Sequence, residues 1–478
     1  MLLGLARAGG YGLAGALLAA LAGVVLVASR LPELAVWHTA ELDEEFVAGS
    51  PVHSFEQYLA LEQRLFAQLE AEVLTRIDPD ASHETNRFHR GSLSDPARWP
   101  RNWNRSFELR TRAPRAGVLL LHGLTDSPYS LRSVAERLHD AGAWVVGLRL
   151  PGHGTTPSGL TEVRWQDMAA AVRVAAQHLA GAVGNRPLIL VGYSNGGALA
   201  VEYALAGLVD DTLARVERLV LLSPEIGISP AAALAVWQKR LGRLLGLEKL
   251  AWQSVLPEYN PFQYQSFATN AAEQAHLITR QIARRFDALA PTKRLADFPP
   301  TLAFQSAVDS TVSTPAVIEG LMEKLPANGH ELVLFDLNRM SGIAPLLAFD
   351  PAEQLATLLR QRKLTFALSI VANRNPRVRD VVLHHLAAGS PEVVVSDLGL
   401  AWPRRVFSLS HVALPFPASD PLYGDGSGEP SPGLELGHLA LRGESHVLQV
   451  SSGAMLRQRW NPFHPYLEAR LLEFTGLD

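Results

Sequence analysis

The chain has 478 residues, of which 47% are hydrophobic and 19% are charged, a balance that excludes a wholly disordered or fibrous protein and suffices for a large buried core. Lys and Arg number 43 against 47 Asp and Glu, a net charge of −4, so no basic excess supplies the phosphate neutralisation that nucleic-acid binding needs. Cysteine is absent, which excludes disulfides, zinc–thiolate sites and a cysteine nucleophile but does not identify a compartment. No group of His, Asp and Glu has metal-ligand spacing, so no metal site is expected.

The apolar character of residues 1–31 predicts the cellular location of the protein. The run Ala8–Ser29 contains no charged side chain, and Arg7 and Arg30 stand on either side of it. A helix that rises about 1.5 Å per residue would cross a hydrocarbon core of about 30 Å with this run. We therefore expect a single-pass membrane anchor of undetermined orientation, with a membrane as partner. A cleaved signal peptide that ends near residues 27–29 and a buried helix are the alternatives.

Residues 32–110 are predicted to form a helical arm and a linker. Hydrophobic side chains recur at helical spacing over residues 54–77, while acidic and other polar side chains fill the opposite face. Residues 78–105 are polar, with Pro, Asn and Trp, as in a linker or a wrapping loop. The rest of the chain, residues 111–478, is expected to form the main domain.

Short apolar runs alternate with helical patterns in the first half of the main domain. Strands are predicted at residues 118–121, 144–148, 188–191 and 219–222, with helices at residues 130–141, 165–183 and 195–208. Short, fully apolar strands between helices indicate a mostly parallel sheet that is covered on both faces.

The alternation stops after Pro224. Residues 226–297 carry mainly helical patterns and are predicted to be an inserted helical cap, because strand-like runs resume at 301–306 and 332–337. The cap contains aromatic side chains that would either line an acyl pocket or simply pack the cap onto the sheet, namely Trp237, Trp252, Tyr259, Phe262, Tyr264 and Phe267.

A second insertion is predicted at about residues 340–405. This region has helix-like stretches at 351–363 and 377–388 and strand-like stretches at 366–371 and 392–395.

The segment 188–197, LILVGYSNGG, places a G-x-S-x-G motif between a predicted strand and a predicted helix. A sharp turn of this kind holds the serine hydroxyl above the sheet edge, and the glycines at 192 and 196 let the strand and the helix approach closely. The helix N-terminus behind the turn stabilises developing negative charge. Ser194 is therefore predicted to be a nucleophile, with an inert serine in a structural turn as the alternative.

A second strand also ends in a motif that suits acyl transfer. Residues 118–121 form an apolar run that is followed by His122 and Gly123. In an acyl-transfer site, a backbone N–H just after such a strand pairs with the N–H that follows the nucleophile, and together they bind the oxyanion. Leu124 and Asn195 are the predicted donors, and His122 is expected to be structural.

With these motifs the chain resembles the α/β-hydrolase family, most closely its branch of monoacylglycerol lipases and lysophospholipase-like enzymes. The matching motifs are residues 122–123 (HG), 148–154 (LRLPGHG) and 192–197 (GYSNGG), in the family's order and spacing. The resemblance covers residues 118–225 well and 300–337 moderately. It implies an α/β-hydrolase fold and ester or thioester hydrolysis through an acyl-enzyme, without a cofactor.

A serine nucleophile in this family needs an acid and a histidine later in the chain. Asp309 follows the predicted strand 301–306 and is the preferred acid, because the family's acid lies in an Asp-x-x-Val turn of this kind. Glu225, just beyond the predicted strand 219–222, is the rival. Asp336 lies within a predicted strand and is expected to be structural.

The histidine departs from the family's usual place, which is shortly after the strand that follows the acid. Here that strand is residues 332–337, yet no histidine occurs between His330 and His384. We predict His411 as the base, because it ends the apolar, strand-like run 406–410 and would share a sheet edge with Ser194. Weaker candidates are His384, His385, His438, His446 and His464.

The sequence thus predicts a membrane-anchored serine hydrolase of the lipase, lysophospholipase or carboxylesterase type. Ser194, His411 and Asp309 are its predicted triad, and an acyl ester or lipid is its predicted substrate. Two alternatives stay open. One is a hydrolase-fold binding protein without turnover, favoured by the missing histidine, and the other is a serine peptidase of the same fold.

Overall fold

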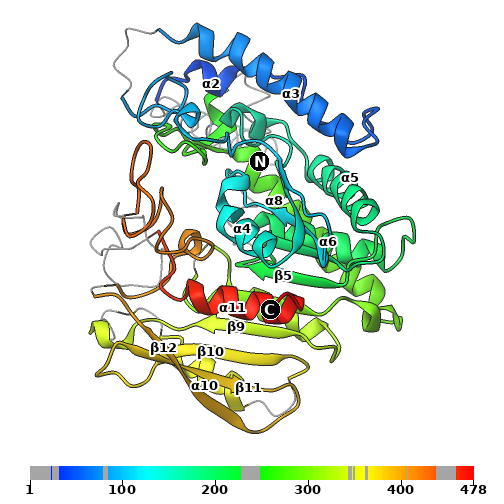
Figure 1. The fold of residues 1–478 in the computed structure, drawn as a ribbon, viewed down its shortest axis with the longest axis vertical. Coiled ribbons are helices and arrows are strands. Elements are labelled where there is room, and N and C mark those ends of the chain that lie inside the picture. Colours follow the sequence, from blue (N-terminus) through cyan, green and yellow to red (C-terminus); the bar gives the residue numbers. More distant parts are fainter. Residues whose placement is uncertain are drawn as a thin grey trace, which may run out of the picture.

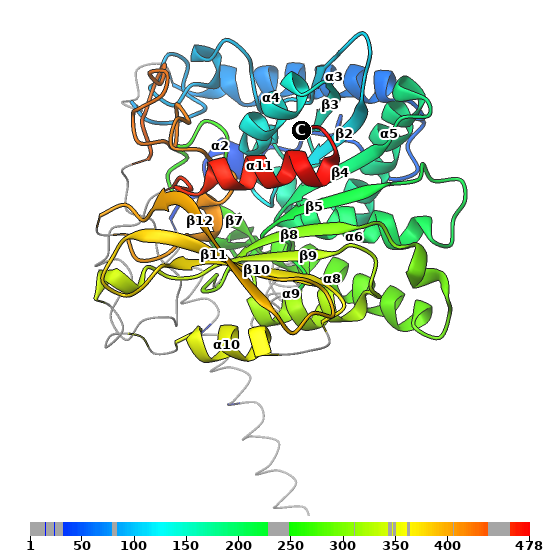
Figure 2. The same cartoon turned by 60° about the horizontal axis from the view of Figure 1, so that its bottom comes forward.

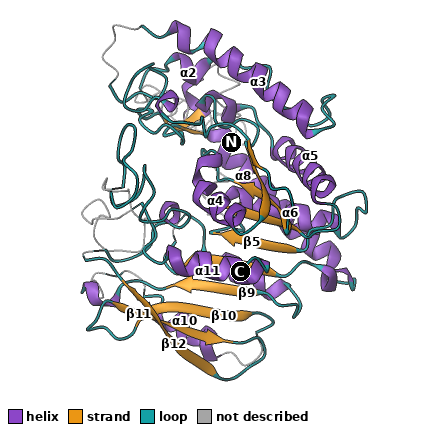
Figure 3. Ribbon diagram, viewed as in Figure 1, coloured by secondary structure: helices purple, strands orange, loops and turns teal. Residues whose placement is uncertain are grey.

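The computed structural model describes residues 32–78, 84–227, 248–309, 311–342, 350–360, 364–404, 406–437 and 459–478, together with the single residues 15, 23 and 347. In this part of the chain, ten strands form one sheet in the order β1-β3-β2-β4-β5-β8-β9-β10-β11-β12 (Figures 1 and 3). The strands are β1 (Phe107–Leu109), β2 (Ala116–Leu121), β3 (Ala143–Leu148), β4 (Leu188–Tyr193), β5 (Arg218–Leu222), β8 (Thr301–Ser306), β9 (Glu331–Phe335), β10 (Ala367–Asn373), β11 (Asp380–Leu386) and β12 (Val393–Ala401).

The predicted mostly parallel sheet is confirmed. All neighbouring strands from β3 across to β10 are parallel, whereas β1 joins β3, β11 joins β10 and β12 joins β11 in antiparallel register. Every residue of β2, β4, β8 and β9 is buried, as the continuous apolar runs predict for strands with both faces covered.

Helices cover both faces of the sheet (Figure 2). One core contains side chains of α4 and α11, and the other contains side chains of α3, α5, α6, α8, α9 and α10. These helices are α3 (Phe55–Glu72), α4 (Arg132–Asp140), α5 (Trp165–Val183), α6 (Asn195–Gly207), α8 (Thr269–Leu289), α9 (Thr314–Gly320), α10 (Ala352–Arg360) and α11 (His464–Thr475).

The N-terminal arm, which includes α2 (Val36–Thr39) and α3, packs into the core of the main domain and also pairs with one buried cation of that domain. Arg149 follows β3, is 1% exposed, and forms ion pairs with Glu45 at 2.9 Å and with Glu62 of α3 at 3.2 Å. The hydroxyl of Tyr58 donates to the Arg149 carbonyl oxygen at 2.6 Å. The predicted helix 54–77 is therefore present in large part, and its contacts explain why it lies against the sheet.

Part of the predicted cap, residues 228–247, lies outside the described residues. Its described part has a short 3₁₀ turn, Glu248–Ala251, and an antiparallel ribbon of β6 (Trp252–Ser254) and β7 (Phe267–Ala268), and it continues into the predicted helix, α8. Ile278, Ile282 and Phe286 of α8 belong to the same core as the sheet and α6. The long helix of this region therefore covers the sheet.

The aromatic side chains of the same region are largely packing residues. Trp252, Phe262 and Tyr264 are buried, and the Phe262 ring stacks on Tyr129 with 4.4 Å between ring centroids. Trp237 lies outside the described residues. An acyl pocket formed by these residues stays a prediction.

The region 340–405 extends the sheet. Helix α10 corresponds to the predicted helix at 351–363, and β10 and β12 correspond to the two strand-like stretches. The helix-like reading of 377–388 was wrong, because residues 380–386 form β11 between β10 and β12. A short apolar pattern does not distinguish a strand from a helix, and here pairing with two neighbouring strands decided the outcome.

The strand-like run 406–410 is also not a strand. The free edge of β9 that it would need is occupied by β10, whose residues Ala367–Val371 pair with Glu331–Phe335. Instead the run is buried beyond the end of β9, and His411 opens a short 3₁₀ turn, His411–Ala413.

The prediction of a single-pass membrane location is corrected. Within the ranges that the structure describes, no helix combines the length and the apolar character needed to cross a bilayer. The run Ala8–Ser29, on which the prediction rested, lies outside the described residues apart from Gly15 and Gly23.

Candidate active site

Ser194 stands on a strained turn between β4 and α6. β4 ends at Tyr193, α6 begins at Asn195, and Ser194 has φ 53° and ψ −118°. A positive φ is unfavourable for a residue with a side chain and persists only where the surrounding structure enforces it. Here the Ser194 N–H donates to the Leu222 carbonyl oxygen at 2.9 Å, which ties the turn to the end of β5.

The glycines of the motif are required by close backbone contacts. A Cβ on Gly192 would overlap the Gly196 carbonyl, and a Cβ on Gly196 would overlap the Leu121 carbonyl of β2. A Cβ on Gly197 would lie 2.8 Å from the Cβ of Pro224. The motif therefore places the first turn of α6 directly against two neighbouring strand ends.

The structure brings Ser194, His411 and Asp309 together. His411 Nε2 lies 3.0 Å from Ser194 Oγ, and His411 Nδ1 lies 2.8 Å from Asp309 Oδ2. The three residues are 7%, 6% and 7% exposed, respectively. A carboxylate only accepts hydrogen bonds, so Nδ1 carries the proton and Nε2 is left to accept from the serine hydroxyl. This tautomer suits a general base that faces Ser194.

Asp309 is held in a turn that immobilises its carboxylate. Its Oδ1 accepts from the backbone N–H groups of Thr311 at 2.9 Å and Val312 at 3.0 Å. Its Oδ2 accepts from the side-chain amide of Gln305 at 3.2 Å in addition to facing His411. Asp309 follows β8 as Ser194 follows β4, so both lie at the carboxyl-end edge of the parallel sheet.

The two predicted oxyanion donors follow residues of the Ser194 turn and its neighbour: Asn195 comes directly after Ser194, and Leu124 comes directly after Gly123, whose added Cβ would lie 3.2 Å from the Ser194 Cβ. Asn195 is the first residue of α6, so its N–H has no partner within the helix. Among the described residues, no hydrogen bond occupies the N–H of Leu124. His122 supports the loop that contains Leu124: its Nε2 accepts from the Leu150 N–H at 3.0 Å, and its Nδ1 lies 2.9 Å from the Gly123 carbonyl oxygen.

The rival acids have other backbone and side-chain partners. Glu225 donates its backbone N–H to the Ser194 carbonyl oxygen at 3.0 Å, and Asp336 pairs with Arg339 at 3.0 Å. Burial raises the pKa of the Glu225 carboxyl to about 7, opposed by the attraction of His411. The carboxylate that lies within hydrogen-bond distance of His411 Nδ1 is that of Asp309, at 2.8 Å.

The weaker histidine candidates, and His330, which was not a candidate, occupy structural positions or lie outside the described residues. His330 Nδ1 accepts from the Thr301 N–H at the opposite end of the sheet, and His384 and His385 lie on β11. His464 Nε2 lies 3.1 Å from the Pro415 carbonyl oxygen. Histidines 438 and 446 are outside the described part of the chain.

Sequence reasoning did not identify Asp126, a further acid beside the site. It is 6% exposed and accepts from the Ser127 N–H at 2.9 Å. Burial raises its pKa to about 7, against the opposing effects of that N–H, of Ser130 and of His411. Its position two residues after Leu124 was the available signal.

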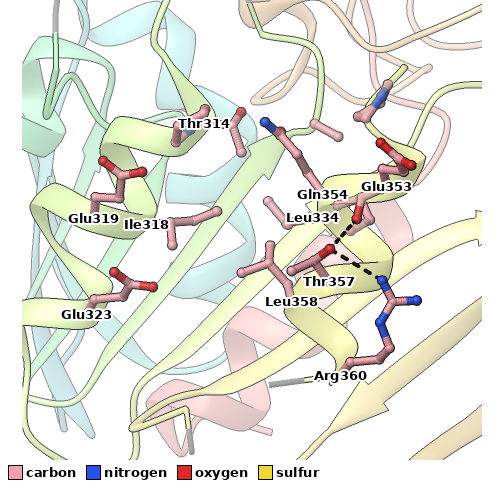
Figure 4. Close-up of a pocket in the computed structure, with 14 residues that line it drawn as sticks. Thr314, Ile318, Glu319, Glu323, Leu334, Glu353, Gln354, Thr357, Leu358 and Arg360 are labelled. Carbon is pink, nitrogen blue, oxygen red and sulfur yellow. Dashed lines mark hydrogen bonds between the residues drawn. The ribbon is translucent and has the colours of Figure 1, made fainter. Parts of the chain in front are cut away.

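A separate groove lies away from these residues. It has a volume of about 540 Å³ and lies between α9 and α10, over Leu334 of β9 (Figure 4). Ile318 and Leu358 are on its apolar walls, and Glu319 and Glu353 are on its rim. None of the residues that line it is Ser194, Asp309 or His411, so we do not assign the groove to the candidate site. Within the described ranges, no cluster of three or more His, Asp or Glu residues has the arrangement of a metal site.

A mostly parallel sheet, covered on both faces and carrying a serine on the turn between a strand and a helix, defines an α/β hydrolase. A family model described as serine aminopeptidase, S33, matches residues 112–337. The thermostable monoacylglycerol lipase of Bacillus sp. (strain H-257) is 35% identical over 88 residues, which is 18% of this chain and 34% of that lipase. The matched part therefore spans about a third of the length of this curated relative.

Two solved lipase structures are also similar. The monoacylglycerol lipase of Paleococcus ferrophilus is 20% identical with a TM-score of 0.37, over 48% of this chain and 88% of that one. A soluble variant of the monoglyceride lipase of Saccharomyces cerevisiae is 15% identical with a TM-score of 0.37, over 48% and 82% of the two chains. The family model and the lipase relative agree with the resemblance predicted from the motifs: this chain is similar to α/β hydrolases of the monoacylglycerol lipase type.

Proposed function

We propose that this protein is a serine hydrolase that cleaves carboxylic esters with an acyl chain through an acyl-enzyme. The observation that supports this most directly is the hydrogen-bonded chain from Ser194 through His411 to Asp309, at 3.0 Å and 2.8 Å. In the proposal, Ser194 is the nucleophile, His411 the general base and acid, and Asp309 the group that orients and stabilises the imidazolium.

The proposed reaction has two halves. Ser194 Oγ attacks the ester carbonyl carbon while His411 Nε2 takes its proton, and the N–H groups of Leu124 and Asn195 stabilise the oxyanion. The tetrahedral intermediate collapses, the alcohol leaves with the proton from His411, and the acyl group stays on Ser194. Water then attacks the acyl-enzyme with the same help from His411, and the carboxylic acid is released.

The experiment is labelling by a fluorophosphonate probe and hydrolysis of p-nitrophenyl esters of increasing chain length. Ser194→Ala should abolish labelling and lower kcat by roughly a thousandfold to a millionfold, because triad members act as a unit. Ser223→Ala is the matched control. Ser223 is also a buried serine with positive φ, 44°, at the end of a neighbouring strand. Labelling of Ser194→Ala at the wild-type rate would refute Ser194 as the nucleophile, and absence of labelling in the wild-type protein would favour a binding protein.

A serine peptidase is the second candidate, because the matching family model is described as serine aminopeptidase, S33. Acyl esters and aminoacyl p-nitroanilides compared on the same enzyme separate the two. We expect kcat/KM for the esters to exceed that for the anilides by orders of magnitude. The reverse order would leave the triad in place and change the substrate class.

A further inference from the structure

Between β9 and His411 the chain forms a long segment that lies away from the triad. β9 ends at Phe335, and the following residues form α10, β10, β11 and β12 at one end of the sheet (Figures 1 and 2). The return segment, defined here as residues 406–411, is not part of the sheet. Something other than strand pairing must therefore set the position of His411.

Asn338, just beyond β9, holds the return segment by two hydrogen bonds. Its backbone N–H donates to the Phe407 carbonyl oxygen at 2.5 Å, and its side-chain Nδ2 donates to the Val406 carbonyl oxygen at 2.7 Å. Asn338 is 2% exposed, so these bonds are shielded from water. Phe407 is four positions before His411, so only a short stretch of chain separates these hydrogen bonds from the His411 ring.

The side chain of Asn338 is in turn held by β10. Asn373, the last residue of β10, donates from Nδ2 to Asn338 Oδ1 at 3.2 Å and to the Val378 carbonyl oxygen at 2.9 Å. Its Oδ1 accepts from the Arg339 N–H at 2.8 Å. Asn338 Oδ1 also accepts from the Met340 N–H at 3.2 Å. The two amides are thus oriented by backbone groups on both sides.

A small apolar cluster joins the same segment to the acid. Phe407 packs with Val308, Leu337 and Leu347 in one buried cluster. Val308 immediately precedes Asp309, so movement of the return segment would disturb the packing beside the acid as well. Packing around Phe407 therefore links the position of the base to the position of the acid.

We propose that Asn338 and Asn373 are positioning residues for His411. In this proposal, strand β10 fixes the position of the general base through these two side chains. This inference rests on the proposed function and deepens it. A displacement of a catalytic group by about 1 Å can lower a rate by roughly a hundredfold, so loss of the Asn338 hydrogen bonds should lower kcat. If Asn338 only held residues 340–405 in place, its loss would instead lower folding stability.

The test compares Asn338→Ala, Asn338→Asp and Asn373→Ala in the full chain. Asn338→Asp is nearly isosteric and keeps the acceptor, but it lacks the Nδ2 donor to Val406. We expect kcat for a p-nitrophenyl ester to fall tenfold to a hundredfold in the Asn338 variants and less in Asn373→Ala, with KM changed less than twofold. Fluorophosphonate labelling should slow in parallel.

Asn328→Ala is the control, because its Nδ2 also donates to a backbone carbonyl oxygen, that of Phe298, at 2.9 Å, but away from the triad. It should leave kcat near wild type. In a His411→Ala background, Asn338→Asp should have almost no further effect on kcat.

Two results overturn the positioning role. One is a kcat within twofold of wild type in folded Asn338→Asp, and the other is an equal loss in both backgrounds. Wild-type activity in His411→Ala would instead refute the proposed function, which keeps the two failures distinct. If Asn338→Ala does not fold, Asn338→Asp and Asn373→Ala still decide the question.

Discussion

His411 Nδ1 lies 2.8 Å from Asp309 Oδ2 across 102 residues of sequence, and this contact sets the face that the imidazole turns toward Ser194. Because an amide in place of the carboxylate can donate to Nδ1 and stabilise the wrong tautomer, Asp309→Asn should lower kcat by roughly ten-thousandfold while the fold is retained. Ester hydrolysis under saturating substrate measures the loss.

The same contact predicts strong non-additivity. His411→Ala should lose nearly as much activity as Ser194→Ala, and the double variant should lose little more, because each change disables the same unit. Additive losses on a logarithmic scale would mean that the two side chains act independently, against the proposed triad.

The glycines of the Ser194 turn predict a large stability difference within one helix. Gly196→Ala places a methyl group onto the Leu121 carbonyl, so the first turn of α6 must move, and unfolding free energy should fall by about 3 kcal/mol or more. Gly207→Ala, at the end of the same helix, has nothing within 4 Å of its new methyl group and should be neutral or stabilising by up to about 1 kcal/mol. Urea unfolding of both variants checks this, and equal effects would contradict the close contact.

Asp126 predicts a pH-dependent cost of folding. Its pKa is raised to about 7 in the folded protein, so the folded state holds a proton that the unfolded state has released at pH 5 to 7. Stability therefore falls as pH rises from the unfolded pKa through the folded pKa, by at most about 4 kcal/mol for this group at pH 8. Asp126→Asn removes that penalty and keeps an acceptor for the Ser127 N–H.

We accordingly expect Asp126→Asn to raise Tm clearly at pH 8 and much less at pH 5. Asp140→Asn, an exposed aspartate of α4, is the control and should show no such trend. A gain that is the same at both pH values would show that the carboxyl is not protonated in the folded protein near neutral pH.

The ion pairs of Arg149 predict a large contribution to the stability of the N-terminal arm on the main domain. Arg149→Met removes the partner of two carboxylates, and Glu62 is left buried, so unfolding free energy should fall by about 3–5 kcal/mol. Arg64→Met, which breaks an exposed pair with Glu44, should cost no more than about 1 kcal/mol. Thermal unfolding and limited proteolysis of the arm distinguish them, and similar effects would mean that the arm is held by apolar packing alone.

Local patterns were sufficient for much of the domain. β2, β4 and β8 are continuous apolar runs that are buried on both faces, and α5 shows its amphipathic period in the sequence. The turn at Ser194 was predictable because its requirement for small neighbours is met within a few residues of chain.

The sequence by itself determined the parallel core and the serine turn, because apolar periodicity and turn chemistry act between residues that are close in the chain. Only the tertiary structure decided that residues 380–386 are a strand and that 406–410 are not, because pairing partners and occupied sheet edges are set by distant segments. The position of the His411 ring was likewise decided only by the tertiary structure. Asn338 and Phe407, which meet beyond the end of β9, bring the segment to the site, and no local pattern around residue 411 encodes that meeting.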